Sequence, residues 1–581
     1  MTSFVKYPEV VVSKRRESVR EGYQEIVEQL VSEVKRLNEK KVVLTIDCYP
    51  GVNIKELEEN LIAPLKPAKT VFLDDLYYSS EKVTEMIQYN LTDDRVFGIF
   101  SKHKLSDFFD EEKLESAIEM LASLEEGLVI VYGVGANLVY DSDLLLYADL
   151  TRWEIQNRFN AKMPNWKADN PEEDSLRKIK RAYFIEWPVA DKHKKRLFEK
   201  VDFWLDTNTP NEPKMVSKTD YLKGLKQVVS QPFRLVPYFA PGVWGGEWMR
   251  EKFDLDPDEV NFAWSFNGVP SENSILLTYG DVKFEIPANN VVFQHPVELL
   301  GTKVYGRFGK EFPIRFNFLD TVEGQNLSLQ VHPVTDYVQE TFGAAYTQDE
   351  SYYVMHAEED AVVYLGLKEG IDQDEMIEDL HKAEKGEIMF DAEKYVNVFP
   401  AKKHDHFSIP GGTIHSQGKN SVVLEISSTP NIYTFKLWDW GRLDLDGKPR
   451  PVHLEHGINS IQWYRDTEWV KENLVNPFEK ISDGEGWLEE KTGLHDLEFI
   501  ETRRHWFSEK VHHKTHDSVN VFNLVEGEEA IVESVNGEFE PFVVHYAETF
   551  IIPEQIKEYT IRPYGKSEGK KIATIKAYVR V

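Results

Sequence analysis

The residues best suited to chemistry in this chain lie on one expected strand and on a later Pro-Gly-Gly turn. Residues 326–333 read Asn-Leu-Ser-Leu-Gln-Val-His-Pro, and residues 409–415 read Ile-Pro-Gly-Gly-Thr-Ile-His. Alternate side chains of a strand point to the same side, so Ser328, Gln330 and His332 share one face. A hydroxyl, an amide and an imidazole on one face, with leucine and valine on the other, suit the wall of a small β-barrel around a polar pocket. His415 brings a second imidazole from another short strand.

A carboxylate completes an expected set of metal ligands. Glu350 opens the next apolar segment, Glu-Ser-Tyr-Tyr-Val. One histidine on a strand is more often an ordinary hydrogen-bonded residue, but two histidines with an amide and a carboxylate favour a metal site. Nitrogen and oxygen donors suit zinc best, and manganese, iron or cobalt are alternatives. The only cysteine, Cys48, is far away in the sequence, so no thiolate ligand is expected. The set consists of Gln330, His332, Glu350 and His415 and is expected to hold one Zn²⁺ per chain.

Length and charge exclude several classes of function. The chain has 581 residues, too many for a single hydrophobic core, and about two to four domains are expected. The formal net charge of −31 argues against nucleic-acid binding, which needs Lys and Arg for the phosphates. No stretch approaches the roughly 18–20 apolar residues that span a bilayer, and the first residues lack the apolar core of a signal peptide. One cysteine excludes an intramolecular disulfide, so a cytoplasmic location is expected. The expected partner is a small molecule, without nucleic acid or membrane, and a homo-oligomer is left open.

The apolar pattern changes along the chain. Residues 14–40 have the spacing of an amphipathic helix, and 41–46 is a short apolar strand. Helix-like and strand-like segments then alternate, which predicts an α/β domain with a parallel sheet. A polar segment at 206–213 predicts a linker. Strands with Gly, Pro and Asn turns dominate beyond it, apart from helix-like residues at 373–385. The alternating segments are 54–61, 70–73, 110–124 and 128–132.

Seven motifs follow one another in the second half of the chain. They read Val-Trp-Gly-Gly (243–246), Phe-Pro with Phe-Leu-Asp (312–320), Leu-Ser-Leu-Gln-Val-His-Pro (327–333), Glu-Ser-Tyr-Tyr (350–353), Ile-Pro-Gly-Gly-Thr-Ile-His (409–415), Leu-Glu-Ile (424–426) and Trp-Asp-Trp-Gly-Arg-Leu-Asp with Gly-Lys-Pro-Arg (438–450). In this order they resemble the type I phosphomannose isomerases, the cupin-fold mannose-6-phosphate isomerases. The resemblance covers about 233–480 and extends more loosely to the C-terminus.

The resemblance implies a zinc-dependent aldose–ketose isomerase that interconverts mannose 6-phosphate and fructose 6-phosphate through an enediol(ate). It implies that the four-residue set holds the zinc and that Arg442 is the catalytic arginine. Glu425 projects from an apolar strand, where a buried carboxylate is costly unless it is paired or functional. It resembles the family's active-site glutamate, and we expect it to transfer the proton. Structural ion pairs are the alternative for both residues, with Asp439 or Asp444 as the partner of Arg442.

Two positions depart from the family pattern and concern the substrate. Gln348 and Asn317 stand where the family often has lysines near the substrate, one of them close to the phosphate. Arg315 is two residues from Asn317, hence on the same strand face, and is expected to supply the charge. Ser328 is expected to bind the same phosphate, and Trp244 of the first motif is also assigned to substrate binding. An isomerase of another sugar or sugar phosphate, or a non-catalytic sugar-phosphate sensor, are therefore alternatives.

A strand, loop and helix near the N-terminus have the order of a phosphate-binding loop. The strand at 44–46 runs into Asp-Cys-Tyr-Pro-Gly-Val-Asn at 47–53, and a Lys/Arg-rich helix is expected near 177–181. Over residues 1–212 these features resemble a degenerate uridine kinase or phosphoribulokinase-type P-loop domain. A working P-loop needs a Lys for the phosphates and a Ser or Thr for Mg²⁺, whereas Val52 and Asn53 stand there. We expect no phosphotransfer; a plain α/β scaffold is the alternative.

The fold class expected is multidomain, an N-terminal α/β P-loop-like domain followed by two mainly-β cupin (jelly-roll) barrels. The catalytic barrel is expected at 225–480 and a second, smaller barrel at 481–581. In the second barrel, the position that corresponds to the second expected metal-binding histidine of the first barrel is Glu558. The second barrel is therefore expected to pack and not to catalyse. The histidines at 512–516 are expected at a polar strand edge, with adventitious metal binding as the alternative.

Overall fold

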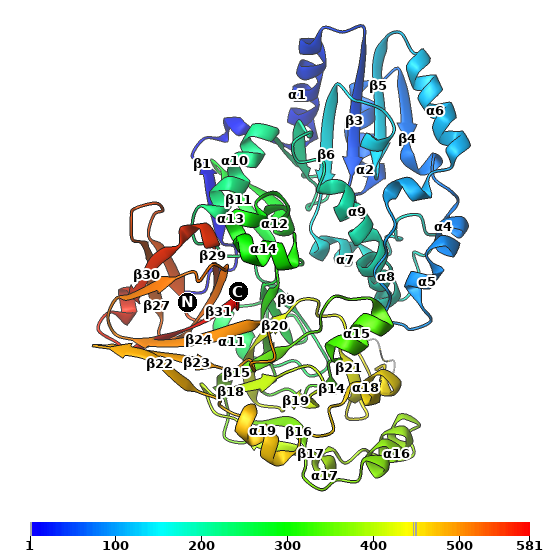
Figure 1. The fold of residues 1–581 in the computed structure, drawn as a ribbon. Helices are drawn as coiled ribbons and strands as arrows, with labels where there is room; N and C mark the ends of the chain where they lie inside the picture. Colours follow the sequence, from blue (N-terminus) through cyan, green and yellow to red (C-terminus); the bar gives the residue numbers. More distant parts are fainter. Residues whose placement is uncertain (1–2, 446, 448–449) are drawn as a thin grey trace. The chain divides into compact units, whose positions relative to one another are not determined.

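The computed structural model describes residues 3–445, 447 and 450–581 and divides the chain into two compact units. We call them the α/β unit and the β unit after their contents (Figure 1). Two residues of the last motif, Lys448 and Pro449, lie outside the described residues. No helix of the described chain has the length and apolar character that crossing a membrane requires. The α/β unit comprises Glu9–Val228 and Ser274–Gln294, and the β unit comprises Met1–Pro8, Val229–Asn273 and His295–Val581.

The α/β unit is built on a largely parallel sheet, which confirms the prediction from the alternating segments. Almost every residue of β3 (Lys41–Cys48) and β5 (Gly127–Gly133) is buried, as is typical of strands covered on both faces. β3 lies parallel to β5 on one side and to β6 on the other. The strand order is β2 (Val19–Glu21), β8 (Lys214–Ser217), β7 (Phe203–Asp206), β6 (Leu144–Asp149), β3, β5 and β4 (Lys69–Phe72). Figure 1 shows the part of this order from β6 to β4.

Two local predictions for this unit were wrong. The helix predicted at 14–40 is shorter, because β2 precedes it and α1 spans only Gly22–Leu37. The polar segment 206–213 is not a linker but the connection between β7 and β8. There the buried Asn208 side chain donates to the buried Asp206 carboxylate at 2.8 Å, so these polar groups fix the start of the turn. The helix predicted at 110–124 is confirmed as α6 (Glu111–Ser123).

The first barrel of the β unit is a pair of facing sheets whose apolar side chains, such as Leu319 and Val363, pack between them. One sheet has the order β18 (His406–Ile409), β15 (Glu350–Ala357), β20 (Ser421–Ser428), β13 (Ile314–Asp320), β10 (Trp264–Gly268) and β9 (Tyr238–Ala240). The other has the order β17 (Val396–Pro400), β16 (Val362–Leu367), β19 (His415–Gln417), β14 (Leu329–Val331) and β21 (Phe435–Trp438). The helix predicted at 373–385 is α16 (Gln373–Glu384).

Along three strands of this barrel, β13, β20 and β15, the residues facing the interior change from apolar to polar. Directly opposite residues of an antiparallel ladder share a face of the sheet. The apolar row belongs to the barrel core, and the two polar rows lie beside the site described below. The rows are Leu319–Val423–Val354, then Asn317–Glu425–Tyr352, then Arg315–Ser427–Glu350.

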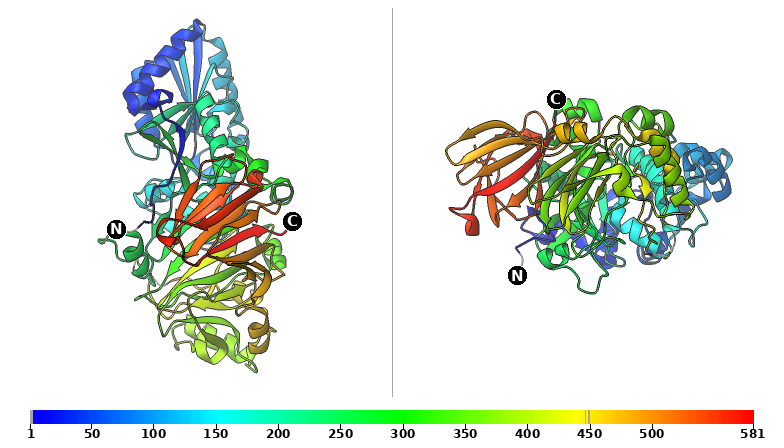
Figure 2. Two further views of the ribbon diagram at one scale, coloured as in Figure 1. Left: turned by 90° about the vertical axis from the view of Figure 1, so that its left-hand side faces the viewer. Right: turned by 90° about the horizontal axis from the view of Figure 1, so that it is seen from below.

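A second barrel follows at the C-terminal end of the chain (Figure 2, orange to red). Its core contains Phe507, Phe522 and Ile561, contributed by both of its sheets. One sheet has the order β22 (Glu479–Gly484), β23 (Trp487–Thr492), β24 (Ile500–Phe507), β31 (Ile572–Val579), β26 (Asn520–Glu526) and β29 (Thr549–Ile552). The other has the order β25 (Val511–Lys514), β30 (Glu558–Pro563), β27 (Glu529–Ser534) and β28 (Phe542–His545).

Candidate metal centre and its cavity

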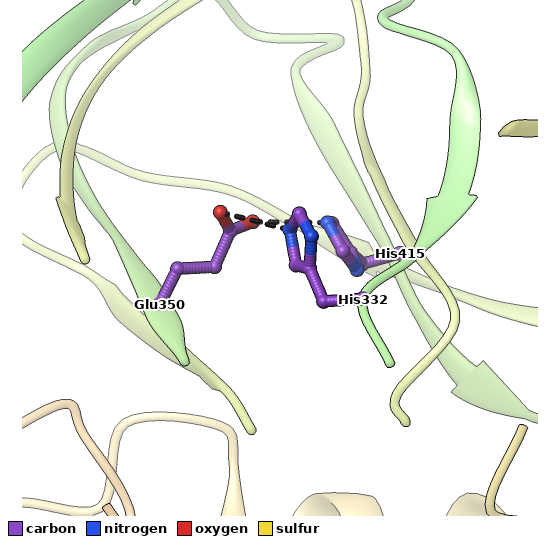
Figure 3. A group of neighbouring side chains, drawn as sticks. All are labelled: His332, Glu350 and His415. Atoms are coloured by element: carbon purple, nitrogen blue, oxygen red, sulfur yellow. Dashed lines mark ion pairs between the residues drawn. The ribbon is translucent and has the colours of Figure 1, made fainter. Parts of the chain in front are cut away.

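Two histidines and a glutamate meet inside the first barrel. Glu350 begins β15 in one sheet, whereas His332 follows β14 and His415 begins β19 in the facing sheet. The glutamate carboxylate lies 3.1 Å from Nε2 of His332 and 2.9 Å from Nε2 of His415 (Figure 3). All three side chains are buried. Their ligand atoms lie within 4.8 Å of one another, which is close enough for one ion.

Backbone carbonyls orient both imidazoles. Nδ1 of His332 lies 3.2 Å from the carbonyl oxygen of Tyr433, and Nδ1 of His415 lies 2.9 Å from that of Thr413. A carbonyl only accepts, so each Nδ1 carries a proton. Each Nε2 faces the Glu350 carboxylate, and once deprotonated it would direct its lone pair to the centre. This is the arrangement that metal-binding histidines use.

Gln330 lies beside these imidazoles on β14, directly opposite His415. Its amide is 3.2 Å from Nε2 of His415, and the hydroxyl of Ser328 donates to the amide oxygen at 3.1 Å. A half-turn of the amide presents its oxygen to the centre. The structure thus brings together the four residues predicted as ligands, and their lone pairs and carboxylate charge fit a divalent ion with nitrogen and oxygen ligands.

Two carboxyl groups of the site have opposite pKa shifts. Burial alone raises the pKa of Glu350, but the adjacent His332 and His415 outweigh it and hold that pKa well below its usual range. Burial raises the pKa of Glu425, and the negative charge of Glu350 raises it further. A pair of carboxyl groups with separated pKa values is suited to two roles, one as a permanent anion and one as a proton carrier.

A cavity of about 320 Å³ opens beside the centre. It is lined by predicted site residues from both sheets and by polar residues that the sequence did not single out. Arg315 and Asn317 both contact Glu425, at 3.6 Å and 3.0 Å respectively. The lining includes Trp244, Arg315, Asn317, Ser328, Gln330, His332, Gln348, Glu350, Glu425, Lys436 and Arg450.

Arg442 is not among the described residues that line this cavity. Its guanidinium pairs with Asp439 and donates to the carbonyl of Asn326 at 2.7 Å. The structure therefore places Arg442 in the ion pair that the sequence offered as the alternative to a catalytic role.

Lys436 supplies a positive charge inside the cavity that the sequence did not reveal. It lies on β21, opposite Gln330, one of the predicted ligands. Its ammonium makes no hydrogen bond or ion pair with any residue in the described part of the chain. Burial, together with the nearby Arg450, lowers the pKa of Lys436 to about 8. In the segment Phe435-Lys436-Leu437, alternation places the lysine on the opposite face of the strand from its apolar neighbours. Only the pairing with Gln330 shows that this face is directed to the cavity.

Trp244 forms an apolar wall of the cavity. Its ring is fully buried and packs edge-on against Trp264, with centroids 4.6 Å apart. Within the described chain the indole N–H of Trp244 has no acceptor. Such a group next to a polar cavity is suited to donate to a ligand oxygen.

The predicted phosphate-loop segment of the α/β unit lies between β3 and α2 (Ile54–Leu57) beside a cavity of about 250 Å³. The basic residues expected to serve it are engaged elsewhere. The Lys178 ammonium donates to three backbone carbonyls at 2.6–3.3 Å, and Arg181 pairs with Glu186 at 3.2 Å. Neither Lys178 nor Arg181 lines the cavity among the described residues.

Comparisons with known proteins find similarity for parts of this chain. Residues 22–230 match a domain family of unknown function, DUF8485. Over 236 residues the chain is 25% identical to the mannose-6-phosphate isomerase ManA of Bacillus subtilis, covering 40% of this chain and 69% of that protein. The mannose-6-phosphate isomerase of Streptococcus mutans is 26% identical over 235 residues, covering 40% and 68%. Among solved structures, the mannose 6-phosphate isomerase from Bacillus subtilis aligns with a TM-score of 0.48 and 18% identity over 60% of this chain and 99% of that one.

Proposed function

We propose that this protein is a metal-dependent aldose–ketose isomerase that interconverts mannose 6-phosphate and fructose 6-phosphate. The observation that carries the proposal is the convergence of Gln330, His332, Glu350 and His415 beside a polar cavity. The named activity of the relatives that are 25–26% identical to part of this chain supports the substrate class. Zinc is the ion proposed, because two neutral imidazoles, a carboxylate and an amide oxygen suit it.

Glu425 is the proposed proton carrier between C1 and C2 of the sugar. A bound metal ion supplies positive charge next to the sugar oxygens on which negative charge develops. Glu425 lines the same cavity, and its raised pKa makes the carboxyl a better proton acceptor. Asn317 and Ser427 donate to its two oxygens at 3.0 Å and 2.8 Å and fix the carboxylate in place.

Lys436 takes the role that the sequence suggested for Arg442. Its ammonium lies next to the metal ligands and has no described partner, so it is available to stabilise the enediolate oxygen. Arg315 is proposed to bind the phosphate together with Ser328, since both line the cavity.

An isomerase of another sugar phosphate is the second candidate. Gln348 and Asn317 replace charged side chains with neutral amides, and both amides are engaged by carboxylates, Gln348 with Glu350 at 2.9 Å and Asn317 with Glu425 at 3.0 Å. The cations thus lie elsewhere in this cavity, which favours a different position for the substrate's anionic group.

An assay of zinc-loaded protein with a panel of phosphorylated aldoses tests the proposal. Mannose 6-phosphate should give the highest kcat/KM, and His332→Ala should lose zinc and activity together while the fold persists. His381→Ala, on the exposed side of α16, is the matched control and should keep both. A preference for another aldose phosphate favours the second candidate. Binding of sugar phosphates without turnover indicates a sensor and contradicts both.

A further inference from the structure

Buried polar side chains gather inside the second barrel, in a place where the sequence predicted only packing. His505, Thr574 and Lys576 are 3%, 0% and 1% exposed, and His513 is 2% exposed. His505 and Thr574 lie opposite each other on β24 and β31, so they share a face, and Lys576 follows two residues later on the same face. His513 enters from the other sheet, and its ring centroid lies 4.5 Å from that of His505. The expectation that the histidines at 512–516 lie at a strand edge therefore fails for His513.

These groups lack the partners that buried polar atoms normally have. Within the described chain, both ring nitrogens of His513, Nδ1 of His505 and the hydroxyl of Thr574 have no hydrogen-bond partner. The ammonium of Lys576 also donates to no described residue; it lies 5.4 Å from the centre of the Tyr578 ring. A buried polar group that stays unsatisfied destabilises the folded chain. The gathering of these groups at one place is the pattern of a site whose partner comes from outside the chain.

The carboxylates near Lys576 are already neutralised by other cations. Arg503 pairs with Glu489 at 3.2 Å and also with Glu501, and Arg580 pairs with Glu501 at 3.3 Å. Lys576 is therefore a surplus positive charge. Burial lowers its pKa to about 8, and the negative charges of Glu489 and Glu501 offset that effect only in part. Such a group is strongly stabilised by an anion beside it.

The two imidazoles define which anion fits. Burial lowers the pKa of His505 to about 4 and that of His513 well below its usual value, so both rings are neutral. Nε2 of His505 lies 3.2 Å from Glu489, which as a carboxylate accepts, so Nδ1 keeps a lone pair and needs a donor. Lys576 instead needs acceptors. An occupant must therefore offer several acceptor oxygens and at least one O–H group.

We propose that the interior of the second barrel binds one small oxyanion, held by Lys576, Thr574, His505 and His513, and that hydrogen phosphate matches it best. Phosphate carries both acceptor oxygens and an O–H group at neutral pH, whereas sulfate carries only acceptors. A divalent cation is disfavoured by the adjacent ammonium. Among the described residues, the cluster of side chains that could hold a metal ion lies in the first barrel and not in the second. The site is separate from the candidate metal centre.

Calorimetric titration of the full chain with inorganic phosphate tests the proposal. Lys576→Met keeps the length of the side chain and removes its charge, and phosphate affinity should fall at least tenfold. Lys570→Met is the matched control, because Lys570 is an exposed lysine of the same barrel that pairs with Glu528. The phosphate affinity of the Lys570→Met variant should stay unchanged. Lys436→Met separates this binding event from any phosphate bound in the cavity of the first barrel and should leave it intact. Sulfate should bind more weakly than phosphate.

The controls keep each outcome decisive. Should Lys576→Met fail to fold, Thr574→Val offers a second test, because it replaces the hydroxyl by a methyl group of similar size. This variant should weaken phosphate binding several-fold at an unchanged Tm. Competition of mannose 6-phosphate for the same event identifies a sugar phosphate as the source of the oxyanion, and its absence identifies free phosphate. Phosphate binding that is unaltered by both Lys576→Met and Thr574→Val, or no binding by the wild-type chain, overturns the proposal.

Discussion

Lys436 is a cavity residue whose charge depends on pH near neutrality. Its pKa of about 8 lies close to physiological pH, because burial and Arg450 disfavour the ammonium form. The cation is present below that pKa and is lost as the pH rises through it. An enediolate needs the cation, so activity should decline above about pH 8.

Substitution of Lys436 gives the first prediction. Lys436→Met should lower kcat by roughly 10²–10³-fold, the loss expected for one donor to a developing oxyanion. Lys436→Arg should retain much of the activity and should remove the decline above about pH 8, because a guanidinium stays charged. Steady-state kinetics from roughly pH 6 to roughly pH 10, a range on both sides of the Lys436 pKa, check both expectations.

Arg442 is the contrasting residue for the same experiment. Because it pairs with Asp439 outside the described lining of the cavity, Arg442→Met should alter stability more than kcat. If Arg442→Met abolishes turnover while Lys436→Met retains it, the role assigned here to Lys436 belongs to Arg442.

The residues that gather at the candidate metal centre could be predicted from the sequence, but Lys436 could not. Alternation in 326–333 places Ser328, Gln330 and His332 on one face, and a strand carries that information locally. Which face of β21 is inward depends on its pairing with β14, more than 100 residues away in the chain. A lysine between two apolar residues has the pattern of an ordinary solvent-facing position, and only the barrel makes it an inward one.

At the scale of elements, the turn before β19 determines where His415 lies. Gly412 has φ +87°, a left-handed conformation, and its backbone N–H donates to the carbonyl of His332 at 2.7 Å. Arg465 holds the same turn by donating to the carbonyls of Pro410 and Gly411, both at 2.9 Å. The turn therefore connects the two histidines of the centre.

Replacement of Gly412 gives the second prediction. A Cβ at this position would lie 2.5 Å from Cγ of Gln462 and 3.0 Å from the carbonyl oxygen of Ser460. Gly412→Ala should therefore shift the turn and weaken metal affinity about 10–100-fold, the usual effect of disturbing the support of a ligand. Competition with a chromophoric chelator measures that affinity.

Gly386→Ala is the matched control for backbone strain. Gly386 also has a left-handed φ, +73°, but nothing lies within 4 Å of the added carbon. This variant should lose about 1–2 kcal/mol of stability from the conformation alone and keep its metal affinity. Equal metal affinities in the two variants would mean that the turn does not position His415.

Strand positions were easier to predict than strand partners. The segments at 41–46 and 128–132 appear as β3 and β5 because long apolar runs with few polar residues suit buried strands. By contrast, β1 (Glu9–Ser13) pairs in parallel with β11 (Ser274–Tyr279) within the α/β unit. Partners so far apart in the chain leave no local pattern, so the sequence gives no sign of this pairing.

At the scale of the whole molecule, metal binding should stabilise one unit and not the other. A ligand that binds only the folded state contributes about 2.7 kcal/mol at 100 times its Kd. For a body of this size the third prediction is a rise in Tm of roughly 2–4 °C for the β unit when zinc is added to chelator-treated protein. Scanning calorimetry resolves it, and His332→Ala should show no rise. A zinc-dependent shift that persists in His332→Ala would indicate a different metal site.

The α/β unit gives the last prediction, the absence of nucleotide phosphotransfer. Val52 and Asn53 stand where a phosphate-binding loop carries Lys and Ser or Thr, and Val52 is buried. Lys178 is bonded to backbone carbonyls and is not free to bind phosphates. The full chain with Mg²⁺–ATP and a panel of nucleosides and sugars should therefore show no transfer above the uncatalysed rate, with an active nucleoside kinase as the positive control. The same assay on His332→Ala excludes a contribution from the metal centre. Turnover of ATP that persists in this variant would contradict the prediction and would assign a catalytic role to the α/β unit.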